Sequence, residues 1–276
     1  MKLLIVGGNG MAGHMLVQYF HRCSTHSVYY TTRDKKDPNG LYMDAGDAVL
    51  MEKVVESVSA DVVINCIGIM NQYAAENPVN AYWINGLLPH RLKRAAEQAG
   101  GRLIHISTDC VFSGEQGEHT EADQCDGTSV YALSKALGEV REAPHLTIRT
   151  SIIGPEIRGG GIGLMDWFMR QDGLVKGYEN VLWNGVTTLE LAKAIDYCLG
   201  HPQINGCIHL CSKEKINKYE LLKQFQKIFD KKDVTVEPDG HIRLDRTLLN
   251  TRTDFAYAVT GYAGMLTELS AWMRSP

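Results

Sequence analysis

An apolar run at residues 3–6 leads directly into Gly7-Gly8-Asn9-Gly10-Met11-Ala12-Gly13, whose glycines have the spacing GxxGxxG. A strand that turns tightly into a helix needs residues without a Cβ, and the free amides at the start of that helix attract phosphate. A glycine-rich turn that binds nothing is the structural alternative. Because this turn follows the first strand and opens an amphipathic stretch over Met11–His21, the sequence favours a dinucleotide-binding site.

Further apolar runs alternate with stretches of helical period. The runs lie at 28–31, 62–65, 102–107 and 146–149, and the helical stretches at Met11–His21, Asp47–Val58, Tyr82–Gln98 and Val130–Glu142. Continuous apolar runs indicate strands that are covered on both faces, and the intervening stretches are long enough to be crossover helices. We therefore predict an α/β fold in which residues 1–150 form a doubly wound parallel Rossmann sheet that binds NAD(P).

Residues 151–276 are predicted to form a smaller C-terminal α/β lobe that binds the substrate. The glycine-rich segment Gly154–Tyr178, which includes Gly159 and Gly160, is expected to be irregular and mobile. A helix is expected from Thr188, with the Thr188 hydroxyl as its cap and Glu190 in its first turn, and with a return to the first domain near 184–205. Later elements are predicted as strands at 207–210 and 234–236 and helices near 218–229 and 265–273.

Composition excludes several classes of protein. Hydrophobic residues make up 44% of the chain, and 28 Lys and Arg oppose 32 Asp and Glu. The net charge of −4 provides no basic footprint for nucleic acid. Seven cysteines without a CxxC pair favour a reducing cytoplasm, and the apolar run at the N-terminus is too short for a signal peptide or a membrane span. The ten histidines are dispersed, so we expect no metal site.

The residues that follow the second predicted strand choose between the two nicotinamide dinucleotides. Arg33 can hold a 2′-phosphate while Thr32 offers a hydroxyl, which favours NADP(H). Arg33 can equally be a solvated surface charge, and Asp34, one position later, keeps NAD(H) possible. Asp44 follows the next short run and is placed to accept a hydrogen bond from the adenine amino group.

A hydroxyl, a phenol and an amine form the predicted catalytic group. Thr108 follows the fifth apolar run, and Tyr131 and Lys135 stand four residues apart, so they share one face of a helix. A phenol has an unperturbed pKa of about 10, and a nearby ammonium is expected to lower it. Tyr131 is then expected to give its proton to a carbonyl oxygen while the Thr108 hydroxyl binds the same oxygen. A YxxxK pair alone often occurs by chance. It becomes significant here because the same sequence also contains the glycine turn and Thr108.

Taken together, these motifs resemble the extended short-chain dehydrogenase/reductases, and within them the dTDP-4-dehydrorhamnose reductase group. The resemblance is carried by GGNGMAG, INCIG at 64–68, INGLLPHRLKRAA at 84–96, HISTDCVFSG at 105–114, YALSKALGE at 131–139, LTIRTSIIG at 146–154 and TTLELAKAI at 187–195. It implies an NAD(P)H-dependent reduction of the 4-keto group of a nucleotide-activated 6-deoxyhexose, with Thr108, Tyr131 and Lys135 as the catalytic triad. It also implies a nucleotide-sugar substrate for polysaccharide precursors and allows a homodimer.

The resemblance carries further residues with it. It implies that Asp109 lies near the substrate with Val111, that Asn65 and Gly68 pass beneath the cofactor, and that Asn85 orders the active-site region. Each has a structural alternative as a turn cap, a strand end or a helix-backbone contact. The predicted cofactor site comprises Gly7, Asn9, Gly10, Met11, Gly13, Thr32, Arg33, Asp44, Asn65, Cys66, Gly68, Asn85, Tyr131 and Lys135.

Side chains of the second half are candidates for holding the sugar nucleotide. Arg246, with Lys176 and Arg252, is a candidate for the diphosphate because guanidinium groups suit such oxyanions, although most surface arginines have no such role. Trp183 and Trp167 can stack on a base or sugar, although packing in the core is the more usual fate of tryptophan.

Two departures from the family pattern leave the substrate open. Ile152 and Ile153 stand where an aromatic residue is usual, and the sequence around Arg246 lacks the Arg-Pro pair of the family. The sequences of these motifs also resemble those of reductases that act on UDP-2-acetamido-2,6-dideoxy-4-keto-hexoses. A non-catalytic regulatory subunit, as in a relative that serves methionine adenosyltransferase, and a sugar-nucleotide epimerase or dehydratase are the alternatives of a different class.

Overall fold

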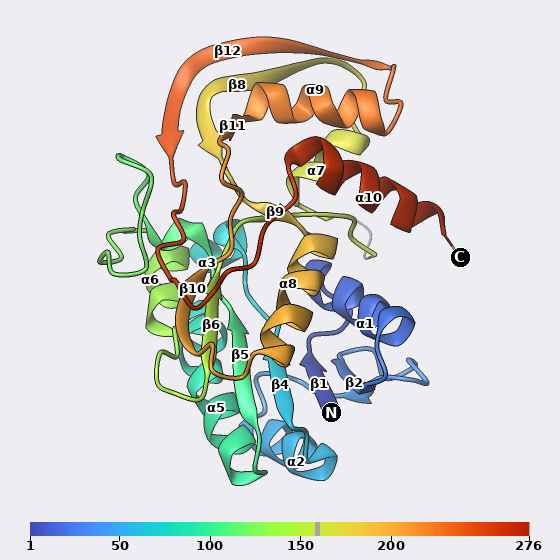
Figure 1. The fold of residues 1–276 in the computed structure, drawn as a ribbon, viewed down its shortest axis with the longest axis vertical. Coiled ribbons are helices and arrows are strands. Elements are labelled where there is room, and N and C mark those ends of the chain that lie inside the picture. The colour runs from blue at the N-terminus through green and yellow to red at the C-terminus, as the bar shows by residue number, and fades with distance from the viewer. Residues whose placement is uncertain (158–160, 276) are drawn as a thin grey trace.

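The computed structural model describes residues 1–157 and 161–275, and a seven-stranded sheet lies at its centre (Figure 1). Its strands are β1 (Lys2–Val6), β2 (Ser27–Thr32), β3 (Leu41–Tyr42), β4 (Val62–Asn65), β5 (Arg102–Ile106), β6 (Leu146–Arg149) and β10 (Gly206–His209). They run in the order β10-β6-β5-β4-β1-β2-β3, and every neighbouring pair is parallel. The predicted doubly wound parallel sheet is confirmed. The order reverses between β1 and β4, and ligands bind at such a point in this type of fold.

Helices cover both faces of this sheet. The two on one face are α1 (Met11–Cys23) and α8 (Thr188–Gly200); those toward the other are α2 (Ala48–Val58), α3 (Asn71–Glu76), α4 (Pro78–Ala81), η1 (Tyr82–Leu87), α5 (Leu88–Gln98) and α6 (Val130–Leu137). Alternate side chains of β1 separate the two cores. Leu3 and Ile5 pack in the α1 and α8 core, whereas Leu4 and Val6 pack in the α2 and α5 core. Burial on both faces is why β1 appears as an uninterrupted apolar run.

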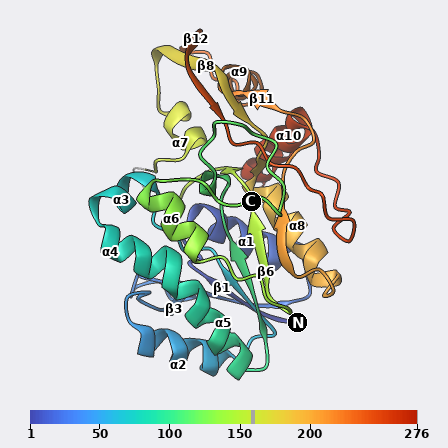
Figure 2. The same cartoon turned by 90° about the vertical axis from the view of Figure 1, so that its left-hand side faces the viewer.

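A second group of elements lies beyond one end of the sheet (Figures 1 and 2). A three-stranded sheet has the order β11-β8-β12, from β8 (Gly173–Trp183), β11 (Ile216–Asn217) and β12 (Val234–Asp245). The remaining elements are the paired strands β7 (Ile152–Ile153) and β9 (Val186–Thr187), the 3-10 turn η2 (Asp109–Val111), and the helices α7 (Leu164–Met169), α9 (Lys218–Ile228) and α10 (Tyr262–Arg274). No helix in the described ranges is both long and apolar enough to cross a membrane.

The segment Gly154–Tyr178 is not irregular throughout, as its glycines suggested. It contains α7, whose Met165 and Phe168 are buried, and the first half of β8. Gly177 serves close packing rather than flexibility, because an added Cβ would lie 2.8 Å from the Cα of Tyr219 in α9. Gly159 and Gly160 lie outside the described residues.

Other predicted boundaries also shift. Thr187, not Thr188, caps α8, because its hydroxyl accepts a hydrogen bond from the Glu190 amide. The Thr188 hydroxyl is buried and has no hydrogen-bond partner within residues 1–157 and 161–275. The helix predicted over Val130–Glu142 ends at Leu137, with Gly138 as its C-cap. Gly138 lies too close to the backbone of Asn85 to carry a Cβ. Strand β12 is longer than predicted and continues to Asp245.

Candidate active site

The glycine turn between β1 and α1 has the geometry of a phosphate cradle. Gly7 has φ +88°, a left-handed value that favours glycine, and its amide donates to the Thr31 hydroxyl at 2.9 Å. An added Cβ on Gly13 would lie 2.1 Å from the Gly7 carbonyl oxygen, so glycine lets α1 begin against the turn. Among the residues that the structure describes, no side chain caps the start of α1 at Gly10, so its first amides face outward with the positive end of the helix dipole. These features fit the pyrophosphate of a dinucleotide.

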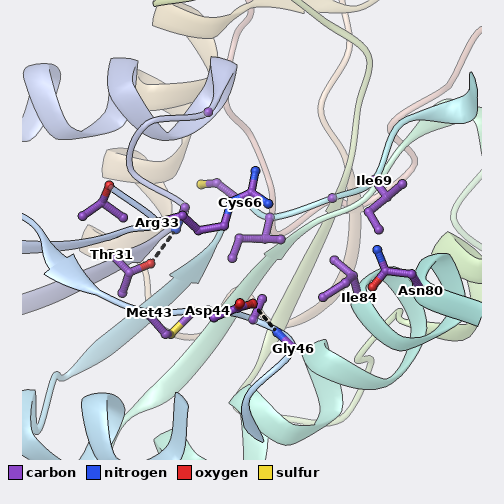
Figure 3. A pocket seen from close by; sticks show the side chains of 15 residues that line it. Thr31, Arg33, Met43, Asp44, Gly46, Cys66, Ile69, Asn80 and Ile84 are labelled. Carbon is purple, nitrogen blue, oxygen red and sulfur yellow. Dashed lines mark hydrogen bonds between the residues drawn. The ribbon is translucent and has the colours of Figure 1, made fainter. Parts of the chain in front are cut away.

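A cavity of about 250 Å³ extends from this turn along the end of the sheet (Figure 3). Seven of the predicted cofactor residues line it: Gly7, Gly10, Thr32, Arg33, Asp44, Cys66 and Gly68. The exposed Arg33 lies at its edge, and the Thr32 hydroxyl accepts a hydrogen bond from Asn9 at 2.9 Å. Asp44 binds the Gly46 amide at 2.9 Å. The cavity therefore offers polar groups where an adenosine half would lie.

Two predicted cofactor residues, Asn85 and Asn65, do not line the cavity but make hydrogen bonds that hold the chain around it. Asn85 is fully buried; its side chain accepts from the Ile69 amide at 2.7 Å and donates to the Ile69 carbonyl and the Ser134 hydroxyl. Asn65 accepts from the Ile67 amide and contacts the His105 ring at 3.0 Å. Asn85 thus connects the loop after β4 to α6, the helix that carries Tyr131.

A second cavity of about 470 Å³ adjoins the first and shares Gly10, Cys66 and Gly68 with it. Thr108, Asp109, Tyr131 and Lys135 all line this second cavity, as do Asn9, Met11 and Trp183. The Thr108 hydroxyl donates to Asp109 at 3.1 Å and accepts from the Cys110 amide at 3.1 Å. The Lys135 ammonium donates to the Ile106 carbonyl at 2.7 Å. The structure therefore brings the four predicted catalytic residues to one space.

The charges in this space differ from the prediction for Tyr131. Burial raises the pKa of Tyr131, and Lys135 is not among the described groups that shift it. The expectation that Lys135 makes this phenol acidic is wrong, because burial raises the pKa of Tyr131 and the charge of Asp109 raises it further. Burial also lowers the pKa of Lys135 to about 8, so it is still largely an ammonium at neutral pH. Burial raises the pKa of Asp109, which Lys218, Thr108 and Arg246 oppose.

A buried ionic network lies behind Thr108. The Glu139 carboxylate accepts from Arg149 at 2.7 and 2.8 Å, from Arg141 at 2.7 Å and from the Ser107 hydroxyl at 3.0 Å. Arg149 is fully buried, and the Glu139 side chain is 2% exposed. Because Ser107 directly precedes Thr108, the network fixes the strand end that carries the predicted catalytic hydroxyl.

Several predicted substrate residues lie elsewhere. Arg246 donates to the Phe112 and Ser113 carbonyls at 2.9 and 3.3 Å, Lys176 pairs with Asp239, and Arg252 pairs with Asp254. Val111 is fully buried against Phe112 and Leu248. Within the described part of the chain, neither of these two cavities is lined by Arg246, Lys176, Arg252, Val111 or Trp167. The diphosphate expected at Arg246 therefore has no support from this arrangement.

Comparison with known proteins places the chain in a family. The model of the RmlD substrate binding domain matches residues 1–243, which is most of the chain. The chain belongs to the RmlD substrate binding domain family. This agrees with the resemblance noted from the glycine turn and the YxxxK pair.

Individual relatives of the RmlD family match different parts of the chain. A dTDP-4-dehydrorhamnose reductase of Mycobacterium tuberculosis is 33% identical over 147 residues, which are 50% of this chain and 44% of that protein. The match thus spans less than half the length of this curated relative. Methionine adenosyltransferase 2 subunit beta of Xenopus tropicalis is 22% identical over 80% of this chain and 70% of its own length. The Bacillus anthracis dTDP-4-dehydrorhamnose reductase structure with NADP has a TM-score of 0.83 at 18% identity, covering 99% of both chains, which shows a shared fold.

Among the cavity residues of this RmlD family member that the sequence did not reveal, Lys218 carries a charge. Lys218 lines the second cavity although it lies 109 residues from Asp109, on the first turn of α9. A signal was available: a cation in the first turn of a helix opposes the helix dipole, so a lysine there suggests a role outside the helix.

Proposed function

We propose that this chain uses NADPH, with NADH as a possible substitute, to reduce the 4-keto group of a nucleotide-activated 6-deoxyhexose. The observation that carries the proposal is the convergence of Thr108, Tyr131 and Lys135 on the cavity that continues from the glycine turn. The names of the RmlD family relatives support the same reaction class. Nicotinamide dinucleotide, when bound, supplies the hydride.

The residues of the chain then divide the remaining work. Gly7, Gly10 and the first amides of α1 would hold the pyrophosphate, and Arg33 and Thr32 would hold the adenosine half. Tyr131 binds the carbonyl oxygen and provides its proton; the raised pKa of Tyr131 keeps the phenol protonated at neutral pH. Thr108 turns its hydroxyl from Asp109 to the same oxygen. Lys135 adds positive charge where the oxygen gains electron density.

We also propose a cellular location, an oligomeric state and a role for each domain of this chain. Seven free thiols in the structure favour a reducing cytoplasm, and the extended short-chain dehydrogenase/reductase resemblance favours a homodimer. We assign cofactor binding to residues 1–150 with a return near 184–205, and substrate binding to residues 151–276. In support, α8 and β10 lie with the large sheet, while β8, β11 and β12 form a sheet of their own.

The decisive assay is NADPH oxidation with a panel of dTDP-, UDP- and GDP-linked 4-keto-6-deoxy sugars, including a UDP-2-acetamido-2,6-dideoxy-4-keto-hexose. Tyr131→Phe is expected to lower turnover by at least 100-fold, because the proton donor is lost, and to leave NADPH affinity within about twofold. Turnover that survives this substitution would refute the mechanism.

A regulatory subunit is the second candidate, favoured by the long match to a methionine adenosyltransferase subunit. The presence of Thr108, Tyr131 and Lys135 around one cavity counts against it. Co-purification with a synthetase, together with no NADPH oxidation for any sugar of the panel, would favour the regulatory role. Turnover without net NADPH consumption would instead indicate an epimerase or dehydratase.

A further inference from the structure

Lys218 presents an ammonium group to the second cavity from the far group of elements. It is the first residue of α9, a helix capped by the Asn217 side chain, which accepts from the Glu220 amide at 2.8 Å. Its Nζ lies 4.8 Å from the ring centroid of Trp183 at the end of β8. A cation over an aromatic ring gains energy from the ring quadrupole, so Trp183 holds the side chain in this position.

The charges around Lys218 show what it faces. Burial lowers the pKa of Lys218 to about 8, while the Asp109 carboxylate opposes this. Within residues 1–157 and 161–275 no carboxylate forms an ion pair with its ammonium. Lys218 therefore keeps hydrogen-bond donors available in the cavity while it interacts with Asp109 through charge.

The carboxylate of Asp109 also faces a second cation. The Arg246 guanidinium acts on Asp109 and is anchored on the Phe112 and Ser113 carbonyls. Of these two cations only Lys218 lines the second cavity, so its ammonium is the one that faces a ligand beside Asp109. Because Asp109 accepts a hydrogen bond from Thr108, this charge lies close to the hydroxyl that faces the reacting carbonyl.

We propose that Lys218 selects the sugar of the substrate by donating a hydrogen bond to an oxygen substituent on the ring whose carbonyl faces Thr108 and Tyr131. Trp183 forms the flat apolar wall beside it. The inference rests on the proposed reductase function and adds a specificity residue to it. The occupant is an oxygen substituent of the sugar, and not the diphosphate, because Lys218 shares the cavity with the residues that face the carbonyl.

The test compares Lys218→Met, which removes the charge and keeps an aliphatic stem, with Lys218→Arg, which keeps the charge. Lys223→Met is the matched control, because Lys223 is exposed on the same helix. For the sugar nucleotide that wild type reduces best, Lys218→Met is expected to lower kcat/KM roughly 10- to 100-fold, mostly through KM. Lys218→Arg should recover part of the loss, and Lys223→Met should match wild type.

Calorimetric titration with dTDP or UDP alone separates the two sources of oxygen. The affinity for the nucleoside diphosphate should be unchanged in Lys218→Met. A matching loss of that affinity would assign Lys218 to the diphosphate and overturn the inference. An unchanged KM in Lys218→Met, or an equal loss of kcat/KM in Lys223→Met, would overturn it as well. If Lys218→Met does not fold, Lys218→Gln replaces it. A wild-type chain that oxidises NADPH with no sugar of the panel fails the proposed function itself, and this inference falls with it.

Discussion

Substitution of Glu139 by Gln tests the buried network behind Thr108. The carboxylate offers two oxygens to four donors on Arg149, Arg141 and Ser107, and the amide of Gln removes both its charge and one acceptor. Arg149 is fully buried and would keep its charge without a counter-ion. Removal of one partner from a buried ion pair costs about 3–5 kcal/mol of the free energy of unfolding. At roughly 2 °C per kcal/mol for a chain of this size, Tm should fall by about 6–10 °C.

The matched control is Glu142→Gln, the same change three residues along the chain. Glu142 pairs with Lys93 at 3.3 Å but its side chain is 63% exposed, so the pair is screened and its loss should cost about 0–1 kcal/mol. Urea unfolding should show a lower midpoint for Glu139→Gln with the same m value, which isolates a change in stability. Equal midpoints for the two variants would refute our account, because the charge of Arg149 would then have another compensating group.

The pH dependence of Glu139→Gln gives a second check. Burial alone would raise the pKa of Glu139, but hydrogen bonds and charge from Arg149 and Arg141 hold it below its usual value. Stability from a lowered carboxyl pKa is present above the unfolded-state value of about 4.3 and is lost as pH falls through the lower folded-state value. The difference in unfolding free energy between wild type and Glu139→Gln should therefore be full at pH 7 and shrink below about pH 4. A difference that grows in acid would contradict this sign.

Two further predictions concern the cofactor end of the site. Gly13→Ala should weaken NADPH binding at least tenfold in calorimetry, because its Cβ would meet the Gly7 carbonyl oxygen at 2.1 Å. Gly200→Ala is the control, because a Cβ added there has no described atom within 4 Å apart from those of its chain neighbours and its own helix. It should leave NADPH binding unchanged and alter stability by less than about 1 kcal/mol. Lys135→Met should abolish turnover yet raise Tm at pH 7, because the buried ammonium loses hydration. Wild-type Tm relative to Lys135→Met should rise between pH 8 and 10.5, where the unfolded chain binds more protons, and a flat difference would argue against the lowered pKa of Lys135.

The sheet was predictable because its signals are local. Strands buried on both faces are continuous apolar runs, and the glycines of the first turn lie within seven residues of each other. The errors in the predicted elements arose where neighbouring residues have the same functional group, or where a contact distant in the sequence determines the local structure. Thr187 and Thr188 carry the same hydroxyl, and only the end of β9 selects the first as the cap. Position 177 requires glycine because Tyr219, 42 positions later, lies against it. The sequence around Gly177 does not reveal this contact.

The site shows the same division between local and distant contacts. The YxxxK pair and Thr108 were identified because a helix and a strand end place them by themselves, whereas Lys218 reaches the cavity from α9, outside the large sheet. The pKa of Tyr131 was predicted in the wrong direction because spacing reports a neighbouring charge but not the depth of burial. Solvent exclusion depends on the whole fold and cannot be inferred from four residues on one helix.

Thr108 lies between two polar assemblies with different exposure to the cavity, so stability and substrate choice should be separable. Glu139, just after α6, and Arg149, at the end of β6, are both buried, so Glu139→Gln should lower Tm while KM for the sugar stays unchanged well below that temperature. Lys218 lines the cavity from the other group of elements, so Lys218→Met should change KM with little effect on Tm. In a double variant each effect should equal that of the single variant, because Glu139 and Lys218 share no hydrogen-bond or ion-pair partner among the described residues. A strong deviation from additivity would show that Asp109 and Ser107 transmit one perturbation to the other through Thr108.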